Sequence, residues 1–370
     1  MRKCKTLFSS ICIALVFMLS ACGVLPAASV SDSSLVSTGS MISSSEASHQ
    51  HSYTGVETLP TCTEQGYTTY SCSCGDSYID DYVNATGKHS YVNGECTQCE
   101  GAEPVFTIAD GYVYFGEYPQ TLKASDITIS ETKNTKGYYL GSDNAWYEKV
   151  TATPALTTYK FNNDEIIVDQ EVYYFKVEPI KWQILSNDGD SLKVVCASVL
   201  VNKPFGNIDN NYKNSTIRSW LNNEFYNTAF STLQQGVVLT TTVDNSKAST
   251  AYIYNGYTCA NTEDKIYLLS YAEAYAITTS PEASELRTKV ATDYARALGV
   301  SIQTNENYGC ASWWLRSPHD PEIYSQFRHS NNVLYVNPLG SVSSSRYSSF
   351  TANVGWTAAG VVPALQIKVA

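Results

Sequence analysis

Short apolar runs rich in Val, Ile and Tyr alternate with polar turns from about residue 103 to the end of the chain. The turns contain Asn, Gly, Asp and Ser, and this alternation is typical of short strands. Seven runs are predicted as strands, at residues 172–177, 180–185, 192–200, 237–243, 265–269, 333–337 and 361–369. Most of the secondary structure in this region is therefore expected to be β.

Three short helices are predicted among these strands from apolar spacing and capping residues. The first has apolar residues at core spacing after a cap at Asn214 or Ser215: Ile217, Trp220, Leu221 and Phe225. The second begins at Ser270, which forms a capping box with Glu273, and the third runs from Thr292 to Leu298 and is closed by Gly299. These elements predict a single α+β domain with mostly antiparallel strands.

The first residues have the pattern of an export signal. Arg2, Lys3 and Lys5 precede an apolar run at residues 7–19, which is shorter than the roughly 20 apolar residues that cross a bilayer. The next string, Leu-Ser-Ala-Cys-Gly, resembles the lipobox of bacterial lipoproteins. The resemblance implies a signal peptide at residues 1–21 and lipid on Cys22, which would hold the chain to the outer face of the cytoplasmic membrane. The alternative is an ordinary secretory signal in which Cys22 is incidental.

Composition divides the rest of the chain into three parts. Residues 22–48 are dominated by Ser and small residues, which predicts a flexible tether. Residues 49–102 are rich in Cys and His, and residues 103–370 form the predicted α+β domain. The net charge of −11 excludes nucleic acid as a partner, because phosphate neutralisation needs clustered Lys and Arg. The 28 Tyr residues fit either a preference for β-sheet or exposed binding faces.

The Cys/His-rich segment predicts a metal site. Its cysteines and histidines are Cys62, Cys72, Cys74, Cys96, Cys99, His49, His51 and His89. Cys96 and Cys99 have the two-residue spacing with which two thiolates bind one tetrahedral ion, and Cys72 and Cys74 are a similar pair shortened by one residue. We therefore expect one structural zinc ion on these four cysteines, as in a zinc ribbon, with His51 or His89 able to replace a thiolate. Disulfides, which an extracellular location favours, and inert thiols are the alternatives.

This segment also resembles a short module that is repeated in many Gram-positive surface proteins. The matching strings are His-x-Tyr, Pro-Thr-Cys-Thr-Glu-x-Gly, a cysteine knuckle, Ala-Thr-Gly-Lys-His and Cys-x-x-Cys, at residues 51–53, 60–66, 72–75, 85–89 and 96–99. The departure from the module is the shortened pair Cys72 and Cys74. The resemblance implies a structural role, as a small spacer that is stapled by metal because it lacks a core.

Eight strings in the larger domain resemble an uncharacterised domain of secreted proteins and lipoproteins from gut-dwelling Gram-positive bacteria. They lie at residues 115–121, 179–185, 215–222, 225–230, 264–270, 292–295, 313–318 and 360–365, and the most distinctive is Trp-Trp-Leu-Arg-Ser-Pro. In that family the last string usually has Arg in place of Val362. The layout is also similar to the C-type-lectin-like fold, in the branch shared with formylglycine-generating enzymes.

The resemblance to lectin-like domains and the local composition imply a ligand-binding face. Aromatic, Arg and Asn side chains separated by Ser and Gly are typical of adaptable surfaces for glycans or proteins. The candidate ligand-binding residues are Trp314, Arg316, Tyr324, Arg328, His329, Asn331, Tyr335, Arg346 and Tyr347. The alternative for the tryptophan string is that Trp313, Trp314 and Leu315 are core residues and Arg316 is an internal brace.

No catalytic residue is assigned. The formylglycine-generating enzymes depend on a pair of cysteines. Here Cys196 sits in an apolar strand, and Cys259 and Cys310 lie in turn-like stretches, where either a structural disulfide or thiols would leave no catalytic pair. We therefore expect a surface lipoprotein whose lectin-like domain binds an extracellular ligand. The alternatives are an exported enzyme of the formylglycine-generating type and a purely structural envelope protein.

Overall fold

The computed structural model describes residues 50–369 except 88, 90, 93–94, 100, 102–103, 251–258, 278–283, 306–307, 320–330, 343, 346–347 and 350. Contacts divide these residues into two compact units, with the boundary at residues 103 and 104. Each unit is described by itself. Residues 1–49, which include the proposed lipidation site Cys22, lie outside the described part of the chain.

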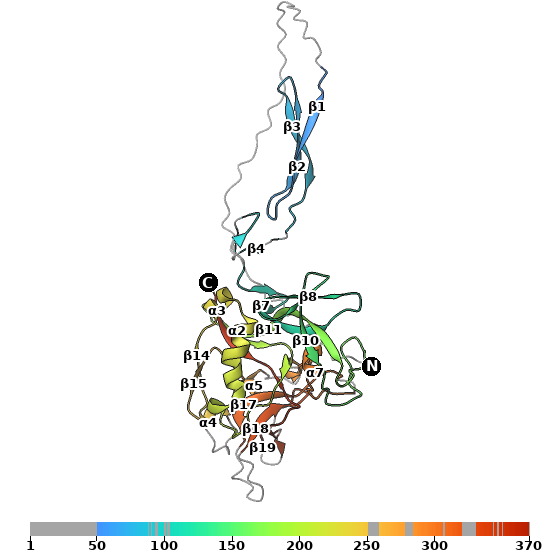
Figure 1. The fold of residues 1–370 in the computed structure, drawn as a ribbon. Coiled ribbons are helices and arrows are strands. Elements are labelled where there is room, and N and C mark those ends of the chain that lie inside the picture. The colour runs from blue at the N-terminus through green and yellow to red at the C-terminus, as the bar shows by residue number, and fades with distance from the viewer. Residues whose placement is uncertain are drawn as a thin grey trace, which may run out of the picture. The chain divides into compact units, whose positions relative to one another are not determined.

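The smaller unit is built from two short antiparallel sheets. Strands β1 (Tyr53–Thr58), β2 (Gly66–Cys72) and β3 (Ser77–Val83) form a three-stranded meander in sequence order (Figure 1). Strand β4 (Tyr91–Val92) pairs with β5 (Glu95–Cys96). Every residue of β3 is exposed, and so are five of the six residues of β1. The sheet therefore encloses no apolar core of its own.

The larger unit is organised around the long strand β11 (Val172–Asn187). Its first half pairs with β10 (Trp146–Thr151), its second half pairs with β12 (Ser191–Cys196), and β7 (Tyr112–Leu122) runs along its other edge. The remaining strands of this nine-stranded sheet are β6 (Thr107–Ala109), β8 (Ile129–Lys133), β9 (Tyr139–Gly141), β16 (Ile266–Tyr267) and β23 (Ala364–Lys368). All its pairings are antiparallel.

A second, five-stranded sheet carries the tryptophan string. Its order is β13 (Val201–Asn202), β22 (Gly360–Val361), β17 (Trp313–Pro318), β18 (Asn332–Val336) and β21 (Thr351–Asn353). The contact between β17 and β22 is parallel, and the others are antiparallel. Two two-stranded sheets are formed by β14 (Thr241–Val243) with β15 (Thr262–Asp264) and by β19 (Ser344–Ser345) with β20 (Ser348–Ser349).

The helices are short. They are α1 (Thr216–Trp220), α2 (Tyr226–Ala229), α3 (Thr232–Val237), α4 (Lys247–Thr250), α5 (Tyr271–Ala276), α6 (Ser284–Arg287) and α7 (Asp293–Ala297), with a 3-10 turn η1 (Tyr212–Asn214) and a π-helical turn η2 (Leu221–Phe225). The three predicted helices are confirmed. Ser215, Ser270 and Thr292 are their N-caps, and each accepts a hydrogen bond from the backbone three residues later.

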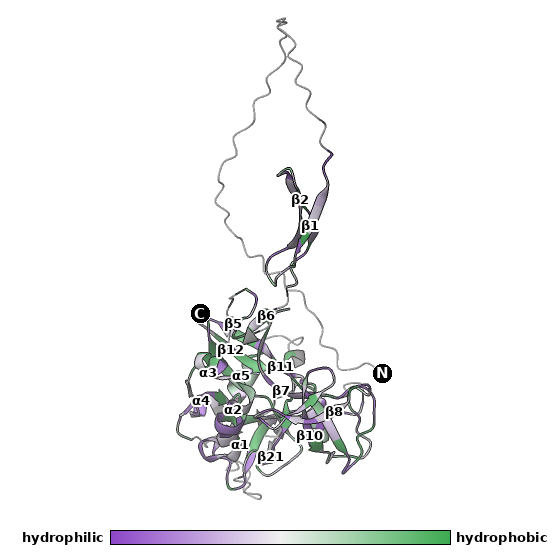
Figure 2. Cartoon of the chain, turned by 45° about the horizontal axis from the view of Figure 1, so that its top comes forward, coloured by the Kyte–Doolittle hydropathy of each residue, from purple (hydrophilic) through white to green (hydrophobic). Residues whose placement is uncertain are grey.

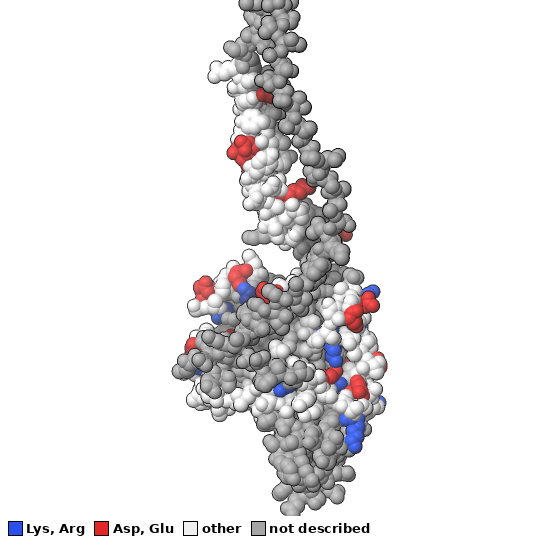
Figure 3. All heavy atoms as spheres, turned by 180° about the vertical axis from the view of Figure 1, so that it is seen from behind, with Lys and Arg blue, Asp and Glu red and all other residues white. Residues whose placement is uncertain are grey.

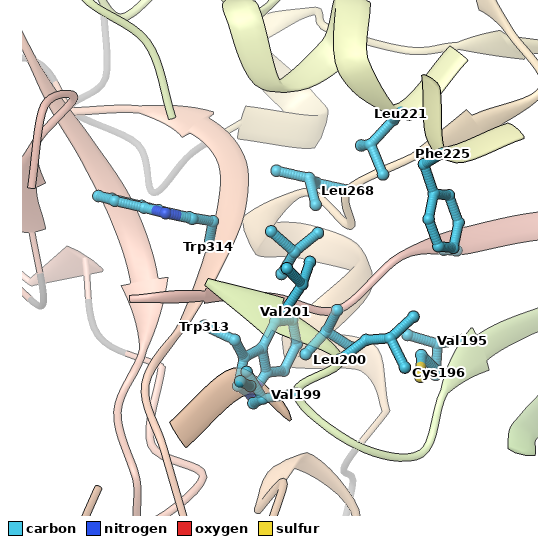
Figure 4. Packing of buried hydrophobic residues seen from close by; sticks show 14 of the residues in the cluster. Val195, Cys196, Val199, Leu200, Val201, Leu221, Phe225, Leu268, Trp313 and Trp314 are labelled. Carbon is cyan, nitrogen blue, oxygen red and sulfur yellow. The ribbon is translucent and has the colours of Figure 1, made fainter. Parts of the chain in front are cut away.

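One continuous core joins the two larger sheets and the helices, and Figure 2 shows hydrophobic residues gathered on the strands around β7, β11 and β12. The Trp313 side chain lies beside Val199 and Leu200, whereas the side chain of Trp314 points in a different direction from that of Trp313 (Figure 4). Both indoles are fully buried, yet their N–H groups are satisfied: Trp313 donates to the carbonyl of Arg287 and Trp314 to that of Lys203, each at 3.0 Å. A buried indole N–H needs such a partner.

The α+β class with mostly antiparallel strands is confirmed, but several strand limits differ. The runs at 172–177 and 180–185 were predicted as two strands, but β11 continues through both, and its register against β7 shifts between Pro179 and Lys181. Such a bulge accommodates a residue without an N–H donor. The run predicted at 237–243 is divided between the end of α3 and β14, and the run at 192–200 ends as a strand at Cys196.

Candidate metal centres

The smaller unit brings four metal-binding side chains together. Cys62 lies in the bend between β1 and β2, His89 precedes β4, Cys96 ends β5, and Cys99 lies in the turn that follows. One ligand atom from each of these residues falls within 4.8 Å of the others. Backbone hydrogen bonds hold the segments in place, because Gly87 N donates to the Cys62 carbonyl at 3.1 Å and Cys96 N donates to that of Gly101 at 2.8 Å.

The spacing of these atoms fits a tetrahedral zinc ion. Zinc bonds of about 2.3 Å to sulfur and about 2.0 Å to nitrogen place two thiolates about 3.8 Å apart, and a thiolate and an imidazole about 3.6 Å apart. In the structure the Sγ atoms of Cys62 and Cys96 are 3.7 Å apart, and Cys99 Sγ lies 3.3 Å from His89 Nδ1. Three thiols and one imidazole are also the donor set of closed structural zinc sites.

The same distances argue against disulfides in this unit. A disulfide requires an S–S separation of about 2.05 Å, and the five cysteines of the unit are all in the thiol form. A hydrogen bond with Cys99, followed by burial and a hydrogen bond with Cys96, raises the pKa of Cys62 to about 12. Because zinc binds thiolates, a bound ion displaces these protons.

A second cluster forms at the other end of the β2–β3 hairpin. His51 Nδ1 lies 3.3 Å from Cys74 Sγ, and His51, Cys72 and Cys74 have their ligand atoms within 4.8 Å of one another. The hairpin turn is closed by two hydrogen bonds, from Gly75 N to the Cys72 carbonyl at 2.9 Å and from Cys72 N to the Asp76 carbonyl at 2.8 Å. Gly75 has φ +98°, a conformation that glycine adopts without strain and that a side chain disfavours.

The structure therefore corrects the predicted arrangement of ligands. One site on Cys72, Cys74, Cys96 and Cys99 was expected, but the two pairs lie in different clusters, His51 joins the first pair and His89 the second. The cluster of His89, Cys96 and Cys99 also contains Cys62, which the prediction left out. The sequence contained an indication of two sites, because five cysteines and three histidines are more than one tetrahedral ion can bind. His49 lies outside the described residues.

Two of the predicted ligand-binding residues are internal, which corrects their assignment. Trp314 is fully buried and Arg316 is 1% exposed. Arg316 donates to the carbonyls of Leu268 and Asp244 at 2.8 and 3.0 Å and to the amide oxygen of Asn245 at 3.2 Å, and it forms an ion pair with Glu273. These contacts support the interpretation of Arg316 as an internal brace, because they direct the guanidinium to acceptors inside the protein.

Glu273 links this brace to the capping box of α5. Its carboxylate pairs with both Arg316 and Lys193, the latter at 2.6 Å, and accepts from the backbone of Ser270 at 2.8 Å. Burial alone would raise its pKa, but the two positive charges and these hydrogen bonds outweigh burial and lower the pKa to about 2. The sequence indicated the cap but not the ion pair, which joins residues far apart in the chain.

The other predicted ligand-binding residues are only partly described. Asn331 and Tyr335 are half-buried, and the Tyr335 ring lies 5.4 Å from the ring of Trp356. Tyr324, Arg328, His329, Arg346 and Tyr347 lie outside the described residues.

The cysteines of the larger unit differ in their bonding and burial. Cys259 is a half-buried thiol and is not bonded to Cys310, which is fully buried. Cys196 is buried in β12 as expected, and burial raises the pKa of its thiol to about 11. Val362, where the resembling family usually has Arg, is fully buried in the core.

Comparison with known proteins gives one match. A family model described as a domain of unknown function (DUF6273) matches residues 190–369, which include β12 and β23. No curated protein and no solved structure matches the chain. Within the described residues, the helices are all too short or too polar to cross a membrane.

Proposed function

We propose that this chain is a surface lipoprotein whose metal-stapled spacer carries a lectin-like domain for an extracellular ligand. In this proposal lipid on Cys22 anchors the chain, residues 22–48 are the tether, residues 49–102 are the zinc-binding spacer, and residues 103–370 bind a glycan or a protein without catalysis. The observation that carries the proposal is the convergence of Cys62, His89, Cys96 and Cys99 in a unit whose described residues include few buried positions other than cysteines.

The need for a staple follows from burial within the smaller unit. Among its described residues, the buried positions are Cys62, Gly66, Cys72 and Cys96, so three of the four belong to the two clusters. Burial of apolar side chains supplies most of the folding free energy of larger domains, and units without it rely on metals or disulfides. Since these cysteines are thiols, a metal ion is the staple that the unit has available.

The metal proposal is tested on the full chain by elemental analysis and limited proteolysis. We expect purified protein to retain zinc after dialysis and Cys99→Ser to lose one equivalent. Chelation should open residues 50–101 to protease, because the unit has no other interior to hold it together. Ser73→Ala, in the turn between Cys72 and Cys74, is the matched control and should retain the metal. Equal protease resistance with and without metal would contradict the staple.

The ligand-binding proposal rests on the half-buried aromatic pair of Tyr335, in β18, and Trp356. Aromatic side chains that keep one face accessible provide large contact area at low cost in conformational entropy. Binding of the full chain to glycan and mucin arrays is expected to saturate and to fall in Tyr335→Ser. Tyr275→Ser, at a tyrosine that is 57% exposed, is the control. Saturable binding that both variants retain would place the ligand elsewhere.

The anchor is tested separately in cells that export the chain. Metabolic labelling with a clickable fatty acid is expected to mark the wild-type protein, and Cys22→Ala should abolish the label and release the protein into the medium. A labelled Cys22→Ala protein would exclude this anchor.

A further inference from the structure

We infer that the smaller unit has a second metal site, made by His51, Cys72 and Cys74, with an open fourth position beside Asp76, and that it holds an exchangeable zinc ion. This site is distinct from the closed cluster of the proposed staple and does not depend on it. Two thiolates and one imidazole leave a tetrahedral ion one position short, which is the arrangement that lets water or another ligand enter.

The imidazole of His51 is held in place by an aromatic row. Its ring stacks on Tyr53 at 5.6 Å and an angle of 10°, Tyr53 meets Tyr78 edge-on at 4.9 Å, and Tyr78 stacks on Tyr70 at 5.0 Å. The pairing of Tyr53 with Cys72 in the β1–β2 register brings this end of β1 beside the hairpin turn that carries Cys74. Stacking on Tyr53 therefore orients the His51 ring beside Cys74, which lowers the cost of ordering this ligand.

Asp76 stands at the edge of the site. Its Oδ2 lies 3.6 Å from His51 Nδ1, beside the fourth position that the three ligands leave open. The Tyr53 hydroxyl donates to the same oxygen at 2.5 Å and so orients the carboxylate. Removal of a group such as Asp76, which lies next to the metal ligands without binding the ion itself, typically lowers metal affinity 10- to 100-fold.

The charge of the unit favours a cation at this site. Its described residues include no Lys or Arg, whereas the carboxylates are Glu57, Glu64, Asp76, Asp80, Asp81 and Glu95. Figure 3 shows acidic side chains on this unit without basic ones among them. Negative charge on one surface raises the local concentration of divalent ions.

The two clusters differ in their access to solvent. In the closed cluster two of four ligands are buried, whereas His51 and Cys74 are both exposed and Cys72 alone is buried in the second. An exposed three-ligand site exchanges its ion more readily than a closed four-ligand site. We therefore expect two zinc equivalents of different affinity, with the weaker one at His51, Cys72 and Cys74.

The test is a titration of the reduced, metal-free full chain with Co²⁺, followed by back-titration with Zn²⁺ and with a chelator. Thiolate ligands give cobalt a charge-transfer absorbance that zinc removes. The wild type is expected to take two equivalents, the second about tenfold or more weakly than the first. Cys74→Ser should lose the weaker equivalent and keep the stronger, and Cys99→Ser should do the reverse.

The role of Asp76 is tested by a matched pair. Asp76→Asn should weaken the second equivalent by about tenfold, and Asp80→Asn, which removes a carboxylate charge from β3 of the same unit, should leave it unchanged. A single wild-type equivalent that Cys74→Ser retains, or two equivalents in Cys74→Ser, would overturn the second site. Equal effects of the two Asn variants would overturn the position of Asp76. The stronger equivalent is tested by Cys99→Ser and the weaker one by Cys74→Ser. The staple and the second site can therefore be refuted independently of each other.

Discussion

Replacing Arg316 by Met decides whether this residue braces the interior or faces a ligand. Met keeps most of the apolar stem and removes the guanidinium, so three hydrogen bonds to Leu268, Asp244 and Asn245 are lost together with the ion pair to Glu273. Removing one partner of a buried ion pair costs about 3–5 kcal/mol. We expect the lower end, about 3 kcal/mol, because Lys193 still pairs with the Glu273 carboxylate.

The assay is urea unfolding followed by tryptophan fluorescence. All six tryptophans lie in the larger unit, at positions 146, 182, 220, 313, 314 and 356, so the signal reports on that unit alone. A loss of about 3 kcal/mol corresponds to a fall in melting temperature on the order of 10 °C.

Lys176→Met is the matched control for Arg316→Met. It removes the cation of the Lys176–Asp143 ion pair, whose distance is 2.8 Å and whose lysine side chain is 39% exposed. An exposed pair contributes roughly 1 kcal/mol or less. If Arg316→Met lost no more stability than Lys176→Met, the internal brace would be refuted and Arg316 would return to the candidates for ligand binding.

Three further predictions concern the larger unit. Because the pKa of Glu273 is lowered to about 2, its stabilisation is complete above its unfolded pKa of 4.5 and is lost as the pH falls toward 2. The unfolding free energy should therefore fall less between pH 6 and pH 3 in Glu273→Gln than in the wild type, and an equal fall in both proteins would contradict this. Burial lowers the pKa of Lys289 to about 8, so the folded state binds this proton more weakly than the unfolded chain does. Lys289→Met should therefore be more stable than the wild type at pH 7, by roughly 1–3 kcal/mol, and this gain in unfolding free energy should shrink as the pH rises from about 8 toward 10.5. A gain that stays constant over that range would exclude the charge as its cause. Gly116 has φ +69°, and a Cβ there would lie 2.6 Å from the ring of Phe230, so Gly116→Ala should cost about 2 kcal/mol or more by urea unfolding, whereas Gly236→Ala, which meets nothing within 4 Å, should not destabilise.

Features that depend on neighbouring residues were predictable from the sequence. The N-caps Ser215, Ser270 and Thr292 were assigned because a capping hydrogen bond spans three residues and is visible as a local pattern. The same signal was present but overlooked at Ser231 and Gln234, which form the capping box of α3. Local rules therefore account for where the helices begin.

Features that depend on long-range pairing were not predictable in the same way. Spacing showed that Cys96 and Cys99 can bind one ion, but which further residues join them is decided by the fold of β1, β2 and the segment before β4. Likewise, Arg316 is distinguished from a surface arginine only by acceptors 43 to 72 residues away in the chain. The Trp-Trp-Leu-Arg-Ser-Pro string was distinctive in the sequence, but its burial follows from the strands that pack around β17.

The position of Cys62 and Cys96 has a mechanical consequence for a chain that is pulled from both ends. Residues 62 and 96 are 34 positions apart, and their Sγ atoms lie 3.7 Å from each other. With an ion between them, tension passes from Cys62 to Cys96 through the metal, so β2 and β3 carry no load. Rupture of the thiolate bonds would release the intervening segment at once and lengthen the chain by about 110 Å, at about 3.4 Å per residue. The metal would then set the force at which this segment yields.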